Sequence, residues 1–313
     1  MIEEPPATLE AVDDVKPVPP RWNGAASRCV RAAGLIQLCS WTRGDRATMI
    51  AFIDGAVDRT HASLRRAHIE VIDQTQAPGS AAREHATFIA SLFAGAGPYC
   101  LGLAPECPIL NVGVVDDAMV GGAIPPRNSA ARLASAVELA SARGARIIQL
   151  SLDLSFHTTE ARPLVVAVEA AVRRGAVVII AAGQRPLAPA NPLLLVPGVI
   201  PVSGVDHDGY PLHSVHRSAA LSAYGISAPA IDIPGAVLPA GTALRAGTSF
   251  AACFVTAAIA LMCSAMPRMA PRDAARRILA ERFASRRGAI PVPLDVDGCF
   301  TFIRSIQEDA DDR

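Results

Sequence analysis

The stretch Met49-Ile-Ala-Phe-Ile-Asp-Gly55 decides the fold class of this chain. Five consecutive apolar residues end at an aspartate and a glycine, which is typical of a strand buried on both faces and followed by a turn. Strands buried on both faces belong to parallel sheets that helices cover on either side. Similar apolar runs occur further along the chain at 109–115, 146–152, 177–182 and 199–203.

Helical patterns lie between these runs. The alanine-rich segment 130–143 has apolar residues at helical spacing and stops near Gly144, and a second helix is expected from Pro163 to 174. A shorter helical stretch is expected at 34–42. Strands that alternate with helices of about a dozen residues predict an α/β protein with a mostly parallel sheet.

Composition limits the function classes. Of the 313 residues 51% are hydrophobic, and 29 basic side chains balance 29 acidic ones, so the net charge gives no electrostatic reason to expect nucleic acid or an anionic membrane as partner. The charge-free apolar run 250–266 is shorter than the roughly 20 residues that a membrane span needs. It is therefore expected to be a buried core helix. We expect neither nucleic acid nor a membrane as partner.

The domain expectation is one globular unit with two appendages. Residues 1–32 are proline-rich and aperiodic, which predicts a flexible N-terminal extension, and 301–313 read as an acidic C-terminal tail. The domain itself is expected to span 33–300. The extension has neither the basic nor the apolar part of a secretory signal.

Cysteines and histidines give no sign of a bound metal. The seven cysteines form no CxxC pair, which predicts free thiols and a cytoplasmic location. The histidines between 207 and 216 lack a cysteine or carboxylate array, so no metal and no cofactor are expected. The segment 206–209 is interpreted as a hairpin turn rather than a calcium loop.

Three polar motifs carry the chemistry. Asp54 follows the first strand, His85 lies near a helix start in 84–95, and Ser249 lies in Ala246-Gly-Thr-Ser-Phe-Ala-Ala-Cys253. A serine at a helix N-terminus can act as nucleophile, a histidine as its base, and a buried aspartate can orient that base. Each motif alone is also what a turn or a helix cap would give. Their occurrence together and in this order predicts a catalytic triad.

These motifs resemble those of the subtilases, serine proteases whose triad has the chain order Asp, His, Ser. They are most similar to the subtilisin-like proteases that mature cyanobactin-type ribosomal peptides, on the segments 33–45, 53–58 and 195–212. The resemblance covers about 33–283. It implies a three-layer subtilisin-like α/β fold and a serine endopeptidase. Its expected partner is a peptide or protein substrate, such as a ribosomally made precursor peptide that loses its leader by hydrolysis.

The resemblance also assigns the substrate edge and the oxyanion residue. Subtilases carry asparagine as an oxyanion donor where this chain has Gln184, whose extra methylene moves the donor by roughly 1.5 Å. The flanking residues Ala182 and Gly183, and the strand end Ser151-Leu152-Asp153, are the expected substrate-binding residues. In addition, Cys253 replaces the proline that usually follows the serine motif.

Two alternatives to an active protease remain open. Gln184 is compatible with a catalytically impaired subtilase that binds a peptide without turning it over. A nucleotide-binding α/β protein is the other, although the chain has no G-x-G-x-x-G or Walker A motif.

In the resembled family, macrocyclising members carry a helical lid between the Asp and His motifs. Only 31 residues separate Asp54 from His85, and 67–84 are expected to be mostly a polar loop around Pro78-Gly79. Hydrolysis is therefore expected rather than cyclisation, because water can reach the acyl-enzyme. A lid formed by residues 1–30 is the remaining alternative.

Overall fold

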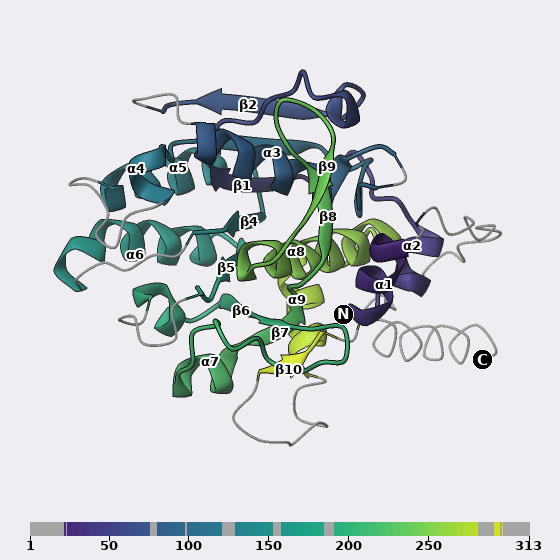
Figure 1. The fold of residues 1–313 in the computed structure, drawn as a ribbon. Coiled ribbons are helices and arrows are strands. Elements are labelled where there is room, and N and C mark those ends of the chain that lie inside the picture. Colours follow the sequence, from purple (N-terminus) through teal and green to yellow (C-terminus); the bar gives the residue numbers. More distant parts are fainter. Residues whose placement is uncertain are drawn as a thin grey trace, which may run out of the picture.

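The central element of the computed structural model is a sheet of eight strands (Figure 1). In chain order they are β1 (Ile50–Asp54), β2 (Ile69–Asp73), β3 (Ile109–Gly113), β4 (Ile147–Leu150), β5 (Val177–Ala181), β6 (Val199–Val205), β7 (Ile226–Pro229) and β10 (Val292–Pro293). Their order across the sheet is β10-β7-β6-β5-β4-β1-β3-β2, and every neighbouring pair is parallel. The predicted α/β class is confirmed.

The remaining elements cover this sheet. The helices are α1 (Gly24–Ala32), α2 (Ile36–Trp41), α3 (Ser80–Ala94), α4 (Asp117–Val120), α5 (Ser129–Ala142), α6 (Thr158–Arg173), α7 (Ala219–Tyr224), α8 (Thr248–Ala265) and α9 (Pro271–Ala280), with short 3-10 turns at Ala62–Leu64 and Pro192–Leu195. An antiparallel hairpin joins β8 (Ile233–Ala236) to β9 (Thr242–Arg245). The structure describes residues 22, 24–75, 80–97, 99–120, 129–152, 158–184, 191–280, 291–294 and 296.

The sheet is buried on both faces, and each face packs in its own apolar cluster. Successive residues of a strand point to opposite faces, so each inner strand contributes to both clusters. In β1, Ile50 and Phe52 belong to one cluster, and Ala51 and Ile53 belong to the other. The first cluster contains side chains of α1, α2, α3, α8 and α9, and the second contains those of α5 and α6. The three layers expected of a subtilisin-like fold are therefore present.

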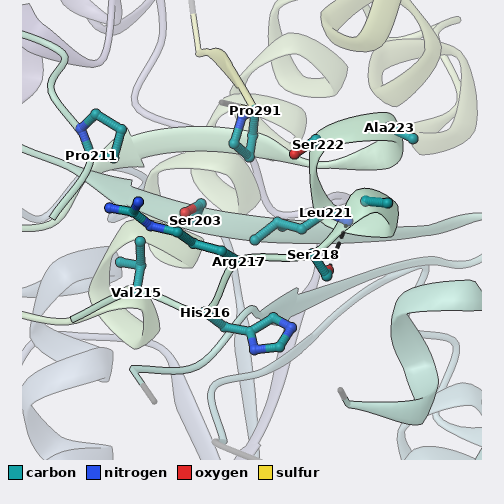
Figure 2. A pocket seen from close by; sticks show the side chains of 11 residues that line it. Ser203, Pro211, Val215, His216, Arg217, Ser218, Leu221, Ser222, Ala223 and Pro291 are labelled. Atoms are coloured by element: carbon teal, nitrogen blue, oxygen red, sulfur yellow. Dashed lines mark hydrogen bonds between the residues drawn. The ribbon is translucent and has the colours of Figure 1, made fainter. Parts of the chain in front are cut away.

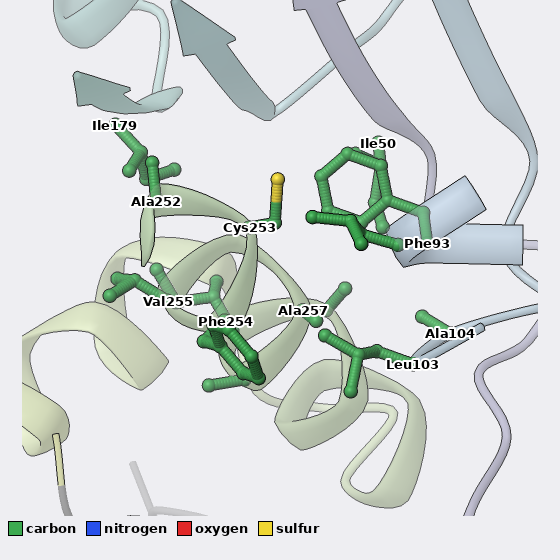
Figure 3. Packing of buried hydrophobic residues seen from close by; sticks show 14 of the residues in the cluster. Ile50, Phe93, Leu103, Ala104, Ile179, Ala252, Cys253, Phe254, Val255 and Ala257 are labelled. Atoms are coloured by element: carbon green, nitrogen blue, oxygen red, sulfur yellow. The ribbon is translucent and has the colours of Figure 1, made fainter. Parts of the chain in front are cut away.

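The helix α8 lies at the centre of the first cluster. All its residues from Phe250 to Cys263 are buried, and it contacts β4, β5, β6 and β7. Figure 3 shows Ala252, Phe254 and Ala257 among side chains from neighbouring elements. In the described part of the chain, α8 is the one helix long and apolar enough to cross a membrane, but 83% of that stretch is buried inside the protein. Such burial matches the core helix predicted from the sequence.

Part of the predicted N-terminal extension is folded. α1 occupies residues 24–32, and its Ala26, Cys29 and Val30 are buried in the first cluster. The expectation of a flexible segment over 1–32 is wrong for α1, because the prolines that suggested it end at Pro20. Residues 1–21 and the acidic tail at 301–313 lie outside the described residues, and the domain limits 33–300 stay a prediction.

Two other expectations need correction. The segment 67–84, expected to be mostly a polar loop, contains the strand β2 and the first turn of α3. β2 pairs with β3 at the edge of the sheet and is partly exposed, so it lacks the continuous apolar run of the inner strands. α6 begins at Thr158, and Pro163, expected to start it, lies inside the helix. The proline removes one backbone donor without ending the helix.

Candidate active site

The carboxyl ends of β1, β4 and β5 meet at one edge of the sheet, and the predicted site residues lie at this edge. Asp54 ends β1, Ser151 directly follows β4, and Gln184 lies just beyond β5. In a strand alternate residues share a face, so Asp54 points to the same side as Ile50 and Phe52, toward the layer of α3 and α8. The sheet therefore directs the polar ends of its strands at these two helices.

α3 brings His85 to Asp54. His85 Nδ1 lies 3.0 Å from Oδ1 and 2.9 Å from Oδ2 of the fully buried Asp54 carboxylate. Asp54 Oδ1 also accepts the N–H of Gly55 at 2.7 Å. A Cβ at Gly55 would lie 2.3 Å from the carbonyl oxygen of Ala82 in α3. Glycine after the aspartate therefore lets α3 approach β1 closely enough for the His85–Asp54 contact.

Two opposing effects set the protonation of His85. Burial lowers its pKa, because the charged ring loses hydration, whereas the negative charge and the hydrogen bond of Asp54 raise it. The net result is a pKa above the ordinary histidine value of 6.5. With Nδ1 held by Asp54, Nε2 is the ring atom placed to take a proton from a nucleophile. Phe250 packs against the ring, with 5.6 Å between the centroids.

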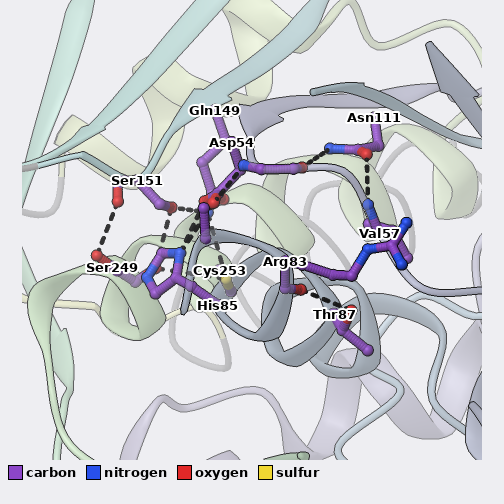
Figure 4. A network of polar contacts seen from close by, with 12 residues as sticks. Asp54, Val57, Arg83, His85, Thr87, Asn111, Gln149, Ser151, Ser249 and Cys253 are labelled. Carbon is purple, nitrogen blue, oxygen red and sulfur yellow. Dashed lines mark hydrogen bonds and ion pairs between the residues drawn. The ribbon is translucent and has the colours of Figure 1, made fainter. Parts of the chain in front are cut away.

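Ser249 is the second residue of α8 and is half-buried at the same edge (Figure 4). Its Oγ donates a hydrogen bond to the carbonyl oxygen of Ser151 at 2.9 Å. Among the described residues no hydrogen bond joins Ser249 to His85. The first N–H groups of a helix have no helical acceptor, and the helix dipole is positive at this end. This end of α8 is thus suited to stabilise an oxyanion.

Gln184 is exposed and lies beside the start of α8. A Cβ on Gly247 would be 2.7 Å from Gln184 Nε2, so the amide nitrogen lies next to the residue that precedes α8. The turn that carries Gln184 is tied to the helix, because Gly183 N–H donates to Thr248 Oγ1 at 3.2 Å. Ala182 and Gly183 are buried behind it. The structure therefore brings the amide of Gln184 to the serine's end of the helix.

The other predicted substrate residues are only partly described. Ser151 and Leu152 are buried where β4 ends, and Asp153 lies outside the described residues. His61 is buried and structural: it caps a 3-10 turn, and its Nε2 lies 3.1 Å from the carbonyl oxygen of Gly241. The predicted turn at 206–209 is confirmed by antiparallel pairing of its flanks.

A pocket of about 730 Å³ lies next to the site between β6 and α7 (Figure 2). Val215, His216 and Leu221 are among its lining residues, and no residue of the predicted triad is. The N–H of His216 donates to the carbonyl oxygen of Gly183 at 3.1 Å, which ties this wall to the turn that carries Gln184. The pocket is therefore adjacent to the triad edge but separate from it.

The sequence analysis missed Gln149. It is fully buried in β4, and its side chain bonds to Ser151, Cys253 and Thr256 behind Ser249. One signal was available: a single polar residue inside an apolar strand, two positions before Ser151 and hence on the same face.

The chain is similar in sequence and in fold to known proteases. A thermophilic serine proteinase of Bacillus sp. (strain AK1) is 31% identical over 236 residues, which cover 71% of this chain and 54% of that protein. The chain thus spans about half the length of this curated relative. The solved structure of the self-cleaved protease domain of PatA is 29% identical, with a TM-score of 0.71, covering 84% of this chain and 98% of the other.

The prenylagaramide maturation protease PagA gives a similar result. Its structure is 27% identical, with a TM-score of 0.71, and covers 85% of this chain and 98% of its own. The profile of the subtilase family, peptidase S8, matches residues 45–289, which include Asp54, His85 and Ser249. The chain belongs to the subtilase family.

Proposed function

We propose that this protein is a serine endopeptidase in which Ser249 is the nucleophile, His85 the general base and Asp54 the residue that orients the base. The observation that carries the proposal is the Asp54–His85 pair at one edge of the sheet, with Ser249 at the helix start beside it. Family membership gives independent support.

In this mechanism Ser249 first turns its hydroxyl from Ser151 toward His85. Its Oγ attacks the scissile carbonyl carbon while the proton passes to His85 Nε2. The oxyanion receives hydrogen bonds from the N–H groups at the start of α8 and from the amide of Gln184. His85 then gives the proton to the leaving amine, and a water molecule hydrolyses the acyl-enzyme by the same route in reverse.

The proposed substrate is a ribosomally made precursor peptide that loses its leader segment. PatA and PagA are described as maturation proteases, and both cover most of this chain. Ser151, Leu152, Asp153, Ala182 and Gly183 form the proposed substrate edge. A substrate strand along it would place its carbonyl carbon beside Ser249.

Hydrolysis rather than cyclisation is proposed for the second half of the reaction. Between Asp54 and His85 the described residues form a 3-10 turn, the strand β2 and the first residues of α3. A helical lid over the cleft needs more chain than this segment offers. Water can therefore reach the acyl-enzyme.

We place the protein in the cytoplasm on the state of its cysteines. The six cysteines that the structure describes are buried and form no disulfide with one another, and burial raises the pKa of Cys107 to about 11. Cysteines that form no disulfides are typical of proteins kept in a reducing compartment, which supports the cytoplasm as the location.

The first prediction concerns the nucleophile. A fluorophosphonate probe should label the wild-type protein at Ser249, and Ser249→Ala should abolish both labelling and peptide cleavage while the melting temperature stays within a few degrees. Intact-protein mass spectrometry gives the readout. A folded wild-type protein that neither reacts with the probe nor cleaves peptides would support the impaired, peptide-binding subtilase instead.

The second prediction uses the raised pKa of His85. The base must be neutral to accept a proton, so kcat/KM should rise with pH through a value above 6.5. In Asp54→Asn burial still lowers the pKa of His85, but the opposing negative charge is gone. The rise of the residual kcat/KM with pH should therefore occur at a lower pH than in the wild-type protein. Rates measured between pH 5 and 9 on one peptide test this. A limb that stays in place in Asp54→Asn would contradict the assigned pair.

The third prediction concerns Gln184. Gln184→Ala should lower kcat far more than it raises KM, because an oxyanion donor acts mainly in the transition state. Loss of one such donor costs about 2.7–4 kcal/mol, a range obtained in subtilisin itself, or roughly 10²–10³ in kcat. Gln184→Asn, which keeps the amide, is the matched control and should retain activity. Unchanged kinetics in Gln184→Ala would leave the helix N–H groups with this task alone.

The fourth prediction concerns the product. A linear peptide should yield fragments with free carboxyl termini, detected by mass spectrometry. In water enriched in ¹⁸O the new carboxylate should gain the label. A main product lighter than the hydrolysed acid by one water would show cyclisation and overturn the hydrolytic mechanism.

A further inference from the structure

The side chain of Gln149 forms a buried fork behind the nucleophile (Figure 4). Its Nε2 donates to Ser151 Oγ at 2.5 Å and to Cys253 Sγ at 3.3 Å. Both of these atoms donate in turn to one acceptor, the carbonyl oxygen of Ser249, at 3.2 Å and 3.5 Å respectively. Two hydrogen-bond chains therefore leave one amide nitrogen and converge on the backbone of the proposed nucleophile.

A third contact fixes the direction of the fork. Thr256, one turn beyond Cys253 in α8, donates its hydroxyl to Gln149 Oε1 at 2.5 Å. With Oε1 held in this way, Nε2 must face Ser151 and Cys253. The amide thus uses both N–H groups and its oxygen, so its burial leaves no polar group without a partner.

The fork needs a donor at position 253. Cys253 stands where subtilases carry proline after the serine motif, and proline has no side-chain donor. Burial raises the pKa of the Cys253 thiol far above its usual range, so the sulfur keeps its hydrogen at any working pH. The replacement therefore adds a hydrogen bond to the first turn of α8.

Ser249 and Ser151 are also bonded in both directions. Ser249 Oγ donates to the carbonyl oxygen of Ser151, and Ser151 Oγ donates to the carbonyl oxygen of Ser249. Because Ser151 belongs to the proposed substrate edge, this pair sets the nucleophile relative to the strand that would receive the scissile peptide. Gln149 holds the hydroxyl of Ser151 in the direction that the pair requires.

We propose that Gln149 and Cys253 are positioning residues that hold the Ser249 carbonyl, and with it the first turn of α8, in register with the substrate edge. The inference rests on the proposed protease function. Both side chains are fully buried, so neither is placed to touch a peptide bound at the surface. They act by limiting the movement of Ser249, and a misplacement of about 1 Å at a reacting group costs as much as a hundredfold in rate.

The test compares variants of the full-length protein in three measurements: kcat and KM on one peptide, the rate of fluorophosphonate labelling, and amide hydrogen exchange at 250–253. Gln149→Leu removes all three hydrogen bonds of the Gln149 amide at similar volume, so the Ser151 hydroxyl and the Cys253 thiol lose the contact that directs them. It should lower kcat and the labelling rate about ten- to hundredfold, leave KM within about twofold, and speed exchange. Full kcat and labelling in a folded Gln149→Leu would overturn the proposal.

A cysteine pair keeps the test decisive if Gln149→Leu does not fold. Cys253→Ala removes one arm and should lower kcat about fivefold, the usual effect of one hydrogen bond, whereas Cys253→Ser keeps a donor and should restore most of it. Cys263→Ala, buried in the same helix away from the fork, is the control and should leave kcat unchanged. Equal kcat in Cys253→Ala and Cys253→Ser would count against the fork.

Hydrogen exchange separates this inference from the proposed function. If the wild-type protein is neither labelled nor active, the protease proposal fails, but the fork still predicts faster exchange at 250–253 in Cys253→Ala than in Cys253→Ser. Equal exchange in the two variants would then overturn the fork as well.

Discussion

The burial of α8 is the constraint on which the rest of the structure depends. From Phe250 to Cys263 every residue of the helix is buried, and side chains such as Phe254 and Ile259 each contribute about 1.5–3 kcal/mol when fully buried. A hydrogen bond such as that of Ser249 contributes only about 1 kcal/mol. Packing therefore decides where the helix lies, and only its ends reach the surface. The N-terminal end of α8 lies where β4 and β5 end, so core formation places Ser249 beside the proposed substrate edge.

Small residues allow the layers to approach closely enough for chemistry. The His85–Asp54 contact spans two layers, and α3 can come so near β1 only because Gly55 has no side chain. A side chain at Gly247, at the start of α8, would meet the amide of Gln184, but the tip of that exposed side chain can move aside, whereas the backbone of α3 cannot. The spacing between β1 and α3 therefore depends on Gly55.

The sequence predicted the features that depend on continuous patterns. Inner strands such as β1 and β5 were predicted from their apolar runs, and the candidate site was predicted from the chain order of Asp54, His85 and Ser249. Features that depend on tertiary contact were missed. β2 is a half-exposed edge strand without a continuous apolar run. α1 follows a proline-rich segment, and the prediction of a flexible extension was carried over to it. The direction of the Ser249 hydroxyl has no local signature. The polar Gln149 inside an apolar strand was a local signal, but its partners in α8 were not predictable, because these contacts join segments about a hundred residues apart.

Two residues that depart from the subtilase pattern, Gln184 and Cys253, both lie at the N-terminal end of α8. Gln184 reaches the helix start from the end of β5, and Cys253 reaches back to the Ser249 carbonyl from one turn inside the helix. Gln184 supplies a side-chain donor at the exposed start of α8, and Cys253 supplies a buried donor to the backbone of Ser249. In the proposed mechanism, Gln184 is a longer oxyanion donor than asparagine, and its greater freedom defines the position of the donor less sharply. The hydrogen bonds of Gln149 and Cys253 behind the proposed nucleophile Ser249 offset part of that loss, because catalysis depends on the relative position of nucleophile and donor.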